Sequence, residues 1–295
     1  MTGAVCVAAP YSLEVIAVYA ATNGRYTLCV HYDEYAESPR KWDNLGRMIC
    51  FHSRYSLGDK HDYRDPIDFL RDAYAHAISD NGKALVRYLK SGKAHGAYLE
   101  YNRSTHEWDL HECTYLRTVL GHSEPGWEIT KSAPKSQLRD DGWFWDYMLE
   151  SLTESDLVEL LNALPDCVLL PLYLYDHGGI TMNTGGFSCP WDSGQVGWIF
   201  ADGNAIRKEY GNTTRKSVAT ATNVLEGEVS VYDDFIRGNC WYFRLYENGE
   251  EVDSCGGFLG DVEKCGLDDC LPDEATHLIG ELEWTDASEE SLLCA

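Results

Sequence analysis

Apolar and polar residues alternate with the two-residue period of β-strands near the start of the chain. Residues 12–21 (SLEVIAVYAA) and 25–34 (RYTLCVHYDE) are two such runs. Asn23-Gly24 between them favours a hairpin, because both residues tolerate a positive φ. Residues 46–57 (GRMICFHSRYSL) predict a third strand. The pattern therefore predicts antiparallel pairing in this region.

Helical spacing replaces this alternation in several longer segments. Residues 66–78 (PIDFLRDAYAHAI) place apolar side chains on one face, and Asp65 is a suitable N-cap before a proline at the first helical position. Thr153 and Asp156 have the spacing of a capping box, with Asp in place of the usual Glu or Gln. Residues 213–238 predict a long helix.

Strand signals return between and after these helices. Residues 96–116 alternate as a hairpin does, and residues 166–176 (DCVLLPLYLYD) form an apolar run typical of a buried strand. Residues 239–258 predict a last hairpin with its turn at Asn248-Gly249. The fold class that follows is α+β, with mainly antiparallel sheets and helices packed on one face.

A polar stretch rich in turn-forming residues suggests a domain boundary. Residues 121–141 (GHSEPGWEITKSAPKSQLRDD) are predicted to be a linker between an N-terminal lobe, 1–120, and a C-terminal lobe, 142–260. Residues 261–295 contain eleven acids and one base, which predicts a solvated or partner-binding tail.

The two halves share a weak internal similarity. Residues 32–51 and 175–200 both run from Tyr-Asp through a polar loop and Trp-Asp to a second strand. This similarity allows two related lobes.

The whole chain is acidic. It has 295 residues, with 48 acids against 24 bases and a formal net charge of -24. This charge argues against a nucleic-acid groove, which needs clustered Lys and Arg, and against binding to anionic membranes. Two interpretations remain, a well-hydrated surface or an acidic face that docks on a basic partner. The predicted contact residues are Asp233, Asp234, Glu250, Glu251, Asp268, Asp269, Asp273 and Glu274.

The eleven cysteines are spread along the chain without a regular disulfide framework. Reduced thiols and a cytoplasmic location are therefore expected. The first 21 residues have no basic n-region and are not predicted to be a signal peptide. No run of 18 apolar residues is present, so we expect no transmembrane helix.

Residues 175–200 (YDHGGITMNTGGFSCPWDSGQVGWIF) hold the densest group of reactive side chains. Cys189 could act as a nucleophile with His177 as base and Asp176 or Asp192 as orienting carboxylate. Pro190 weakens this hypothesis, since it removes one N–H from a potential oxyanion hole. No motif for phosphate binding or for a nucleophilic serine is present.

A metal site is the second hypothesis for this region. Zinc needs three or four converging ligands, which usually come in closely spaced pairs. No Cys-x-x-Cys or His-x-x-x-His pair is present, although Cys255 and the CGLDDC run at 265–270 could add thiolates. We predict no metal and no cofactor.

A structural role accounts for more of these residues. The glycines permit turns, and Asp192 before Ser-Gly suits a turn in which the carboxylate accepts backbone N–H groups. Trp191 and Trp198 would cover the strand ends, and Trp42 and Asp43 would do the same in the N-terminal half. We favour this stiff-connection interpretation over catalysis.

Long motifs in the chain resemble a family of largely uncharacterised proteins encoded by bacteriophages, prophages and conjugative elements. The residues that carry the resemblance are 38–61 (SPRKWDNLGRMICFHSRYSLGDKH), 175–200, 206–211 (IRKEYG) and 249–261 (GEEVDSCGGFLGD). The family supplies no catalytic residues to transfer. The resemblance implies an accessory protein of a mobile element, a class that often acts against host defence.

The leading functional prediction is therefore an anti-CRISPR or antirestriction protein. Its acidic surface would imitate DNA and occupy the Lys/Arg-lined groove of a host defence nuclease or effector, without touching nucleic acid directly. One alternative is a hydrolase that uses the Cys/His/Asp loop, with or without a metal. The other is an element-encoded regulatory or scaffolding protein.

Overall fold

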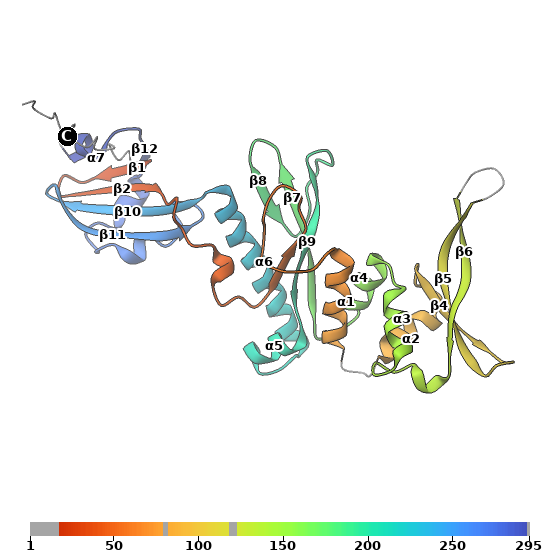
Figure 1. Cartoon of the computed structure of the whole chain (residues 1–295). Coiled ribbons are helices and arrows are strands. Elements are labelled where there is room, and N and C mark those ends of the chain that lie inside the picture. Colours follow the sequence, from red (N-terminus) through yellow and green to blue (C-terminus); the bar gives the residue numbers. More distant parts are fainter. Residues whose placement is uncertain (1–17, 79–81, 118–122, 294–295) are drawn as a thin grey trace, which may run out of the picture. The chain divides into compact units, whose positions relative to one another are not determined.

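The computed structural model describes residues 18–78, 82–117 and 123–293. It contains three sheets with antiparallel strand pairs together with helices, which confirms the α+β class (Figure 1). The predicted strand at residues 12–21 lies largely outside the described residues, and its last part forms a strand.

The chain divides into two compact units. Unit 1 consists of residues 1–42, 179–181 and 230–295, and unit 2 consists of residues 43–178 and 182–229. The predicted lobes therefore differ from the units observed, because each unit is assembled from segments that are distant in sequence.

The chain crosses from unit 2 to unit 1 within helix α6 (Arg215–Arg237). A continuous helix shows neither a loop nor a change of composition at this point, so nothing in the sequence marks the boundary there. Among the described residues, α6 is the longest helix, and no helix is long and apolar enough to cross a membrane.

A five-stranded antiparallel sheet forms the centre of unit 1, in the order β11-β10-β2-β1-β12 (Figure 1). Both predicted Asn-Gly hairpins are confirmed, with a positive φ at Gly24, Asn248 and Gly249. The elements are β1 (Tyr19–Thr22), β2 (Tyr26–Tyr32), the 3-10 helix η1 (Pro39–Lys41), β10 (Cys240–Glu247), β11 (Glu250–Leu259) and β12 (Glu283–Trp284).

The acidic C-terminal segment is part of this fold and differs from the solvated tail predicted at 261–295. Leu267, Leu271 and Leu278 are buried in one core with Phe243 of the sheet. Leucines spaced between the acids supply a buried face, and all the carboxylates of the segment except that of Glu289 remain at the surface. The segment forms η3 (Asp268–Cys270), η4 (Thr276–Glu281) and α7 (Glu289–Leu293).

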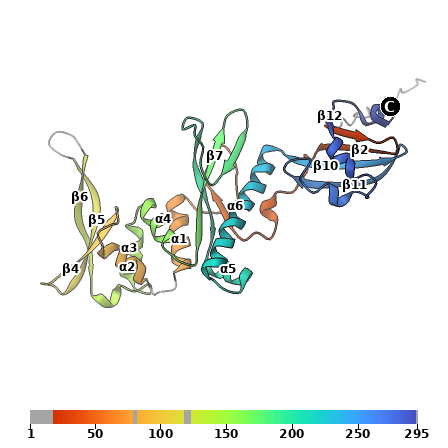
Figure 2. The ribbon, with the colours of Figure 1, turned by 180° about the vertical axis from the view of Figure 1, so that it is seen from behind.

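A four-stranded sheet in the order β3-β9-β7-β8 lies within unit 2. Helices were expected on one face, and here α1 and α4 lie on one face and α6 on the other, as two views agree (Figures 1 and 2). Trp198 packs with Phe69 of α1, whereas Ile199 faces Leu225 of α6 across Gly46. The elements are β3 (Arg47–Cys50), α1 (Pro66–Ala77), α4 (Glu154–Asn162), β7 (Val168–Asp176), β8 (Ile180–Asn183), β9 (Ser193–Ala201) and α5 (Gly203–Tyr210).

The predicted linker at 121–141 contains a strand instead of a flexible connection. Strand β6 pairs with β5 at the edge of a three-stranded sheet in the order β4-β5-β6. An edge strand tolerates Pro125 and Gly126 and carries exposed polar residues, which is why its sequence imitates a loop. The elements are α2 (Lys83–Lys90), β4 (Ala97–Asn102), β5 (Glu107–Arg117), β6 (Ser123–Ala133), η2 (Lys135–Gln137) and α3 (Trp143–Glu150).

The predicted helix starts are confirmed by their hydrogen bonds. The Asp65 carboxylate accepts the N–H of Asp68 at 2.8 Å at the start of α1. Thr153 and Asp156 form the capping box of α4, in which each side chain accepts the backbone N–H of the other residue.

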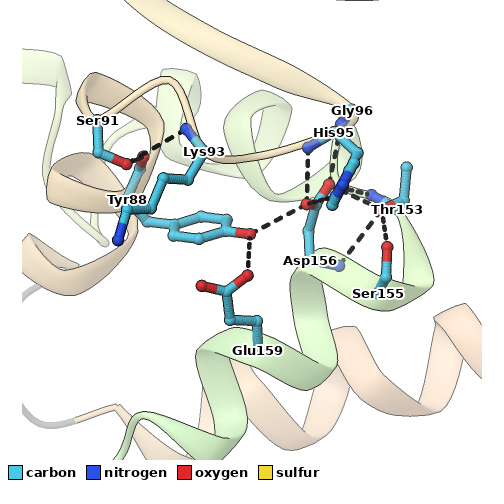
Figure 3. A network of polar contacts seen from close by, with 9 residues as sticks. All are labelled: Tyr88, Ser91, Lys93, His95, Gly96, Thr153, Ser155, Asp156 and Glu159. Atoms are coloured by element: carbon cyan, nitrogen blue, oxygen red, sulfur yellow. Dashed lines mark hydrogen bonds and ion pairs between the residues drawn. The ribbon is translucent and has the colours of Figure 1, made fainter.

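The Asp156 carboxylate also ties α4 to the start of β4 (Figure 3). It is fully buried and accepts the N–H groups of His95 at 2.8 Å and Gly96 at 2.9 Å. The Tyr88 hydroxyl of α2 donates to it at 3.1 Å and to Glu159 at 3.0 Å. Burial opposes ionisation of Asp156, but the hydrogen bonds from His95, Thr153 and Gly96 outweigh it, so the pKa lies below its usual range.

The internal sequence similarity does not correspond to a structural duplication. Residues 32–51 connect β2 to β3, which belong to different sheets. Residues 175–200 connect β7 to β9, which pair directly with each other in one sheet. Similar sequence runs therefore make two different connections.

Candidate functional site

Two of the motifs singled out in the sequence meet in unit 2. Arg54 follows strand β3 and Asp176 ends strand β7, and their Nη1 and Oδ2 atoms are 2.8 Å apart. The Tyr55 hydroxyl donates to the same carboxylate at 3.1 Å. Asp176 therefore fixes the loop after β3 against the end of β7.

Contacts between residues of the loop after β3 also hold its conformation. His52 Nδ1 accepts the N–H groups of Arg54 at 3.3 Å and Tyr55 at 3.1 Å. The His52 and Tyr55 rings stack, with centroids 5.0 Å apart. No pattern in the sequence predicts a role for these three residues, although they lie in the motif CFHSRYSLGD at 50–59.

Two adjoining cavities open at this junction and share His52, Ser53 and Arg54. One has a volume of about 650 Å³, and the other has a volume of about 530 Å³. Charges of both signs line each of them, so neither has the uniform charge that selects an anion or a cation. The second cavity is lined by Phe51, His52, Ser53, Arg54, Leu174, Asp176, Trp191, Asp192, Ser193, Gly194, Gln195 and Val196.

The catalytic candidates are brought close, but in an unsuitable order. Asp192 Oδ2 lies 3.5 Å from the Cys189 thiol and 3.4 Å from His177 Nδ1. In a nucleophilic triad the histidine lies between the nucleophile and the carboxylate. Here the carboxylate lies between the other two, and the His177 side chain is 71% exposed. Asp176 is engaged separately by Arg54.

The residues predicted to stiffen the connection between β7 and β9 differ in their exposure and in their contacts. Trp198 is buried within strand β9, whereas Trp191 is 92% exposed and does not cover a strand end. The Asp192 carboxylate contacts the side chains of Cys189 and His177 instead of backbone N–H groups.

The N-terminal counterparts of these residues lie at the boundary between the units. Trp42 is half-exposed and belongs to unit 1, and Asp43 is exposed and belongs to unit 2. No group of three or more His, Cys, Asp or Glu side chains in the described ranges is arranged to hold a metal ion.

The acids predicted to contact a partner fall in unit 1. Asp233 and Asp234 are half-buried and locally engaged, the first by Arg237 at 3.5 Å and the second by the Asn239 amide at 3.0 Å. The other six are exposed, namely Glu250, Glu251, Asp268, Asp269, Asp273 and Glu274.

The bases of the same region leave most of this charge uncompensated. Residues 230–295 contain 17 acids and three bases. The bases are Arg237, Arg244 and Lys264, and each already lies within 3.5 Å of a carboxylate.

One acid of this segment is structural. Glu289 is buried, and its carboxylate accepts from His31 Nε2 at 2.8 Å and from Arg244 and Tyr246 at 3.0 Å each. Burial and the hydrogen bond to Glu289 raise the pKa of Tyr246 to about 12. These contacts dock α7 on the sheet, and no signal in the sequence distinguishes Glu289 from its exposed neighbour Glu290.

No protein-family model matches the sequence, no curated protein is detectably similar to it, and no solved structure matches its fold.

Proposed function

We propose that the protein is a phage or mobile-element accessory protein that inhibits a host nucleic-acid-directed defence complex of the CRISPR or restriction type. The excess of acids over bases in residues 230–295 is the observation that carries this proposal. The exposed carboxylates of β11, η3 and the turn after η3 would meet a groove lined by Lys and Arg in the place of DNA phosphates. The mobile-element context rests on the sequence resemblance.

Physical chemistry links this charge to a binding role. Segments that are separate in the sequence, β11 and 268–274, contribute exposed acids to one compact unit. Like charges gathered on one folded unit repel each other, and a basic partner relieves this repulsion. Such contacts speed association and weaken as salt rises, because exposed charges are screened.

Charge reversal on unit 1 tests the proposal. A variant with Glu250→Lys, Glu251→Lys and Asp268→Lys changes three exposed acids of this surface. The matched control makes the same change in net charge at three exposed acids of unit 2, Asp140, Glu209 and Glu226.

The readout is a pull-down from bacterial host lysate at low and at high salt. The wild type and the control should retain a nucleic-acid-processing protein at low salt and release it at high salt, whereas the unit 1 variant should not retain it. Equal retention by both variants, or retention that ignores salt, would contradict the proposal.

A hydrolase is the second candidate, because Asp192 contacts both Cys189 and His177. In such an enzyme Cys189→Ala or His177→Ala would abolish turnover while the fold survives. A purified protein that cleaves ester, peptide or glycosidic substrates only with both residues intact would replace the binding proposal.

A further inference from the structure

The described part of unit 1 contains two exposed cysteines, Cys255 and Cys270, that belong to different elements. Cys255 lies in strand β11 and Cys270 ends η3, and both have free thiols. Burial, followed by the neighbouring Cys255 side chain, raises the pKa of Cys270.

The sheet register shows from which face of the sheet Cys255 projects. Cys255 pairs with Phe243 of β10, and directly paired residues of an antiparallel sheet project from the same face. Phe243 is buried in the core that the C-terminal segment covers. Cys255 therefore projects toward that segment from the edge of the same face.

The core also fixes the position of the second thiol. Leu267 and Leu271 are both buried in the core and flank η3 on its two sides. Cys270 is held between these two anchors, on the face of the sheet from which Cys255 projects.

We propose that Cys255 and Cys270 form a reversible disulfide that links the edge strand β11 to the acidic C-terminal segment. The inference stands whether or not the proposed function is right. The oxidant would be a low-molecular-weight disulfide such as oxidised glutathione.

The exchange runs in two steps. The thiolate of one cysteine attacks a sulfur of oxidised glutathione, which forms a mixed disulfide and releases one glutathione thiolate. The thiolate of the other cysteine then attacks the protein sulfur of the mixed disulfide and releases the second glutathione. The protein loses two thiol hydrogens, and one oxidised glutathione becomes two reduced molecules.

The local electrostatics favour persistence of the bond once it has formed. Desolvation and the neighbouring Cys255 thiol raise the pKa of Cys270, and Asp269 and Asp253 add to the shift. A thiol with a raised pKa is a poor leaving group, so reduction of the disulfide is slowed. The bond would hold the acids of β11 and η3 in one arrangement.

Oxidation of the full chain with oxidised glutathione tests the proposal. The tryptic peptides 245–264 and 265–295 should become linked under non-reducing conditions, with the loss of two hydrogens, and dithiothreitol should separate them. Thermal unfolding of unit 1 should shift upward by roughly 10 °C, since the bond closes a short loop.

Cys265 provides the matched control, because it lies in the same peptide and its half-buried thiol is directed to the Val262 carbonyl. The link should survive Cys265→Ser and disappear in Cys270→Ser and in Cys255→Ser. A link that depends on Cys265, or glutathione adducts without any link between the two peptides, would overturn the proposal.

Discussion

Replacement of Asp156 by alanine is the perturbation whose cost the structure defines best. The buried carboxylate accepts the N–H groups of His95, Gly96 and Thr153 at 2.8, 2.9 and 3.0 Å. Asp156→Ala leaves the Thr153 N-cap in place, and loss of the other half of the capping box costs up to about 1 kcal/mol. Each buried donor that is left without an acceptor costs about 1–3 kcal/mol more.

Close packing limits rescue by water. A Cβ added at Gly96 would lie 2.2 Å from the carbonyl oxygen of Ser151, so little space is open beside this donor. We therefore expect Asp156→Ala to lower the free energy of unfolding of unit 2 by about 3–5 kcal/mol. Urea denaturation followed by tryptophan fluorescence measures this difference.

Glu159→Ala is the control, because this exposed carboxylate accepts from the same Tyr88 hydroxyl. Its cost should stay below about 1 kcal/mol. If the two variants differed by less than that amount, the assignment of Asp156 as the central acceptor of this junction would be wrong.

The pH dependence follows from the lowered pKa of Asp156. A carboxyl whose folded pKa is depressed contributes stability above its unfolded pKa of about 3.9 and loses it as pH falls through the folded value. The stability difference between the wild type and Asp156→Asn should therefore be constant near neutral pH and shrink in acid. A difference that grows in acid would contradict this linkage.

Four further substitutions test other parts of the structure. Gly197→Ala should destabilise unit 2 by about 3 kcal/mol, because the added Cβ would lie 1.9 Å from a backbone carbonyl oxygen of β3, whereas Gly194→Ala in the same strand meets nothing within 4 Å and should be tolerated in thermal melts. Glu289→Ala removes the shared acceptor of three side chains and should cost about 2–4 kcal/mol, with faster amide hydrogen exchange in α7; unchanged exchange would show that α7 is docked by other contacts. Cys189→Ala and His177→Ala should leave partner retention unchanged, and loss of retention in folded protein would move the binding site to unit 2.

Local elements could be predicted from the sequence because short-range chemistry determines them. Asp65 before Pro66 starts a helix, and Asn248-Gly249 turns a hairpin, whatever the rest of the chain does. The unit boundary inside α6 could not be predicted in this way. The boundary depends on which distant strands pair, and the local sequence of α6 does not determine that pairing.

The candidate site was only partly visible in the sequence for the same reason. The reactive residues of the loop between β7 and β9 were found, but the contacts of Asp176 with Arg54 and Tyr55 link positions more than a hundred residues apart. The composition of the C-terminal segment predicts a solvated or partner-binding tail, because its acids outnumber its leucines. Only the packing of Leu267 and Leu271 shows that the leucines belong to a core.

Competition with DNA tests whether the acidic surface of unit 1 occupies the nucleic-acid groove of the defence protein. The defence protein retained from host lysate would be purified and titrated with this protein in the presence of its duplex DNA. Binding of DNA and of this protein should be mutually exclusive. The apparent affinity of the defence protein for DNA should fall as this protein is added, and it should be restored when the Lys variant of Glu250, Glu251 and Asp268 replaces it. A stable complex that contains both the DNA and this protein would contradict the claim that its acidic surface occupies the groove.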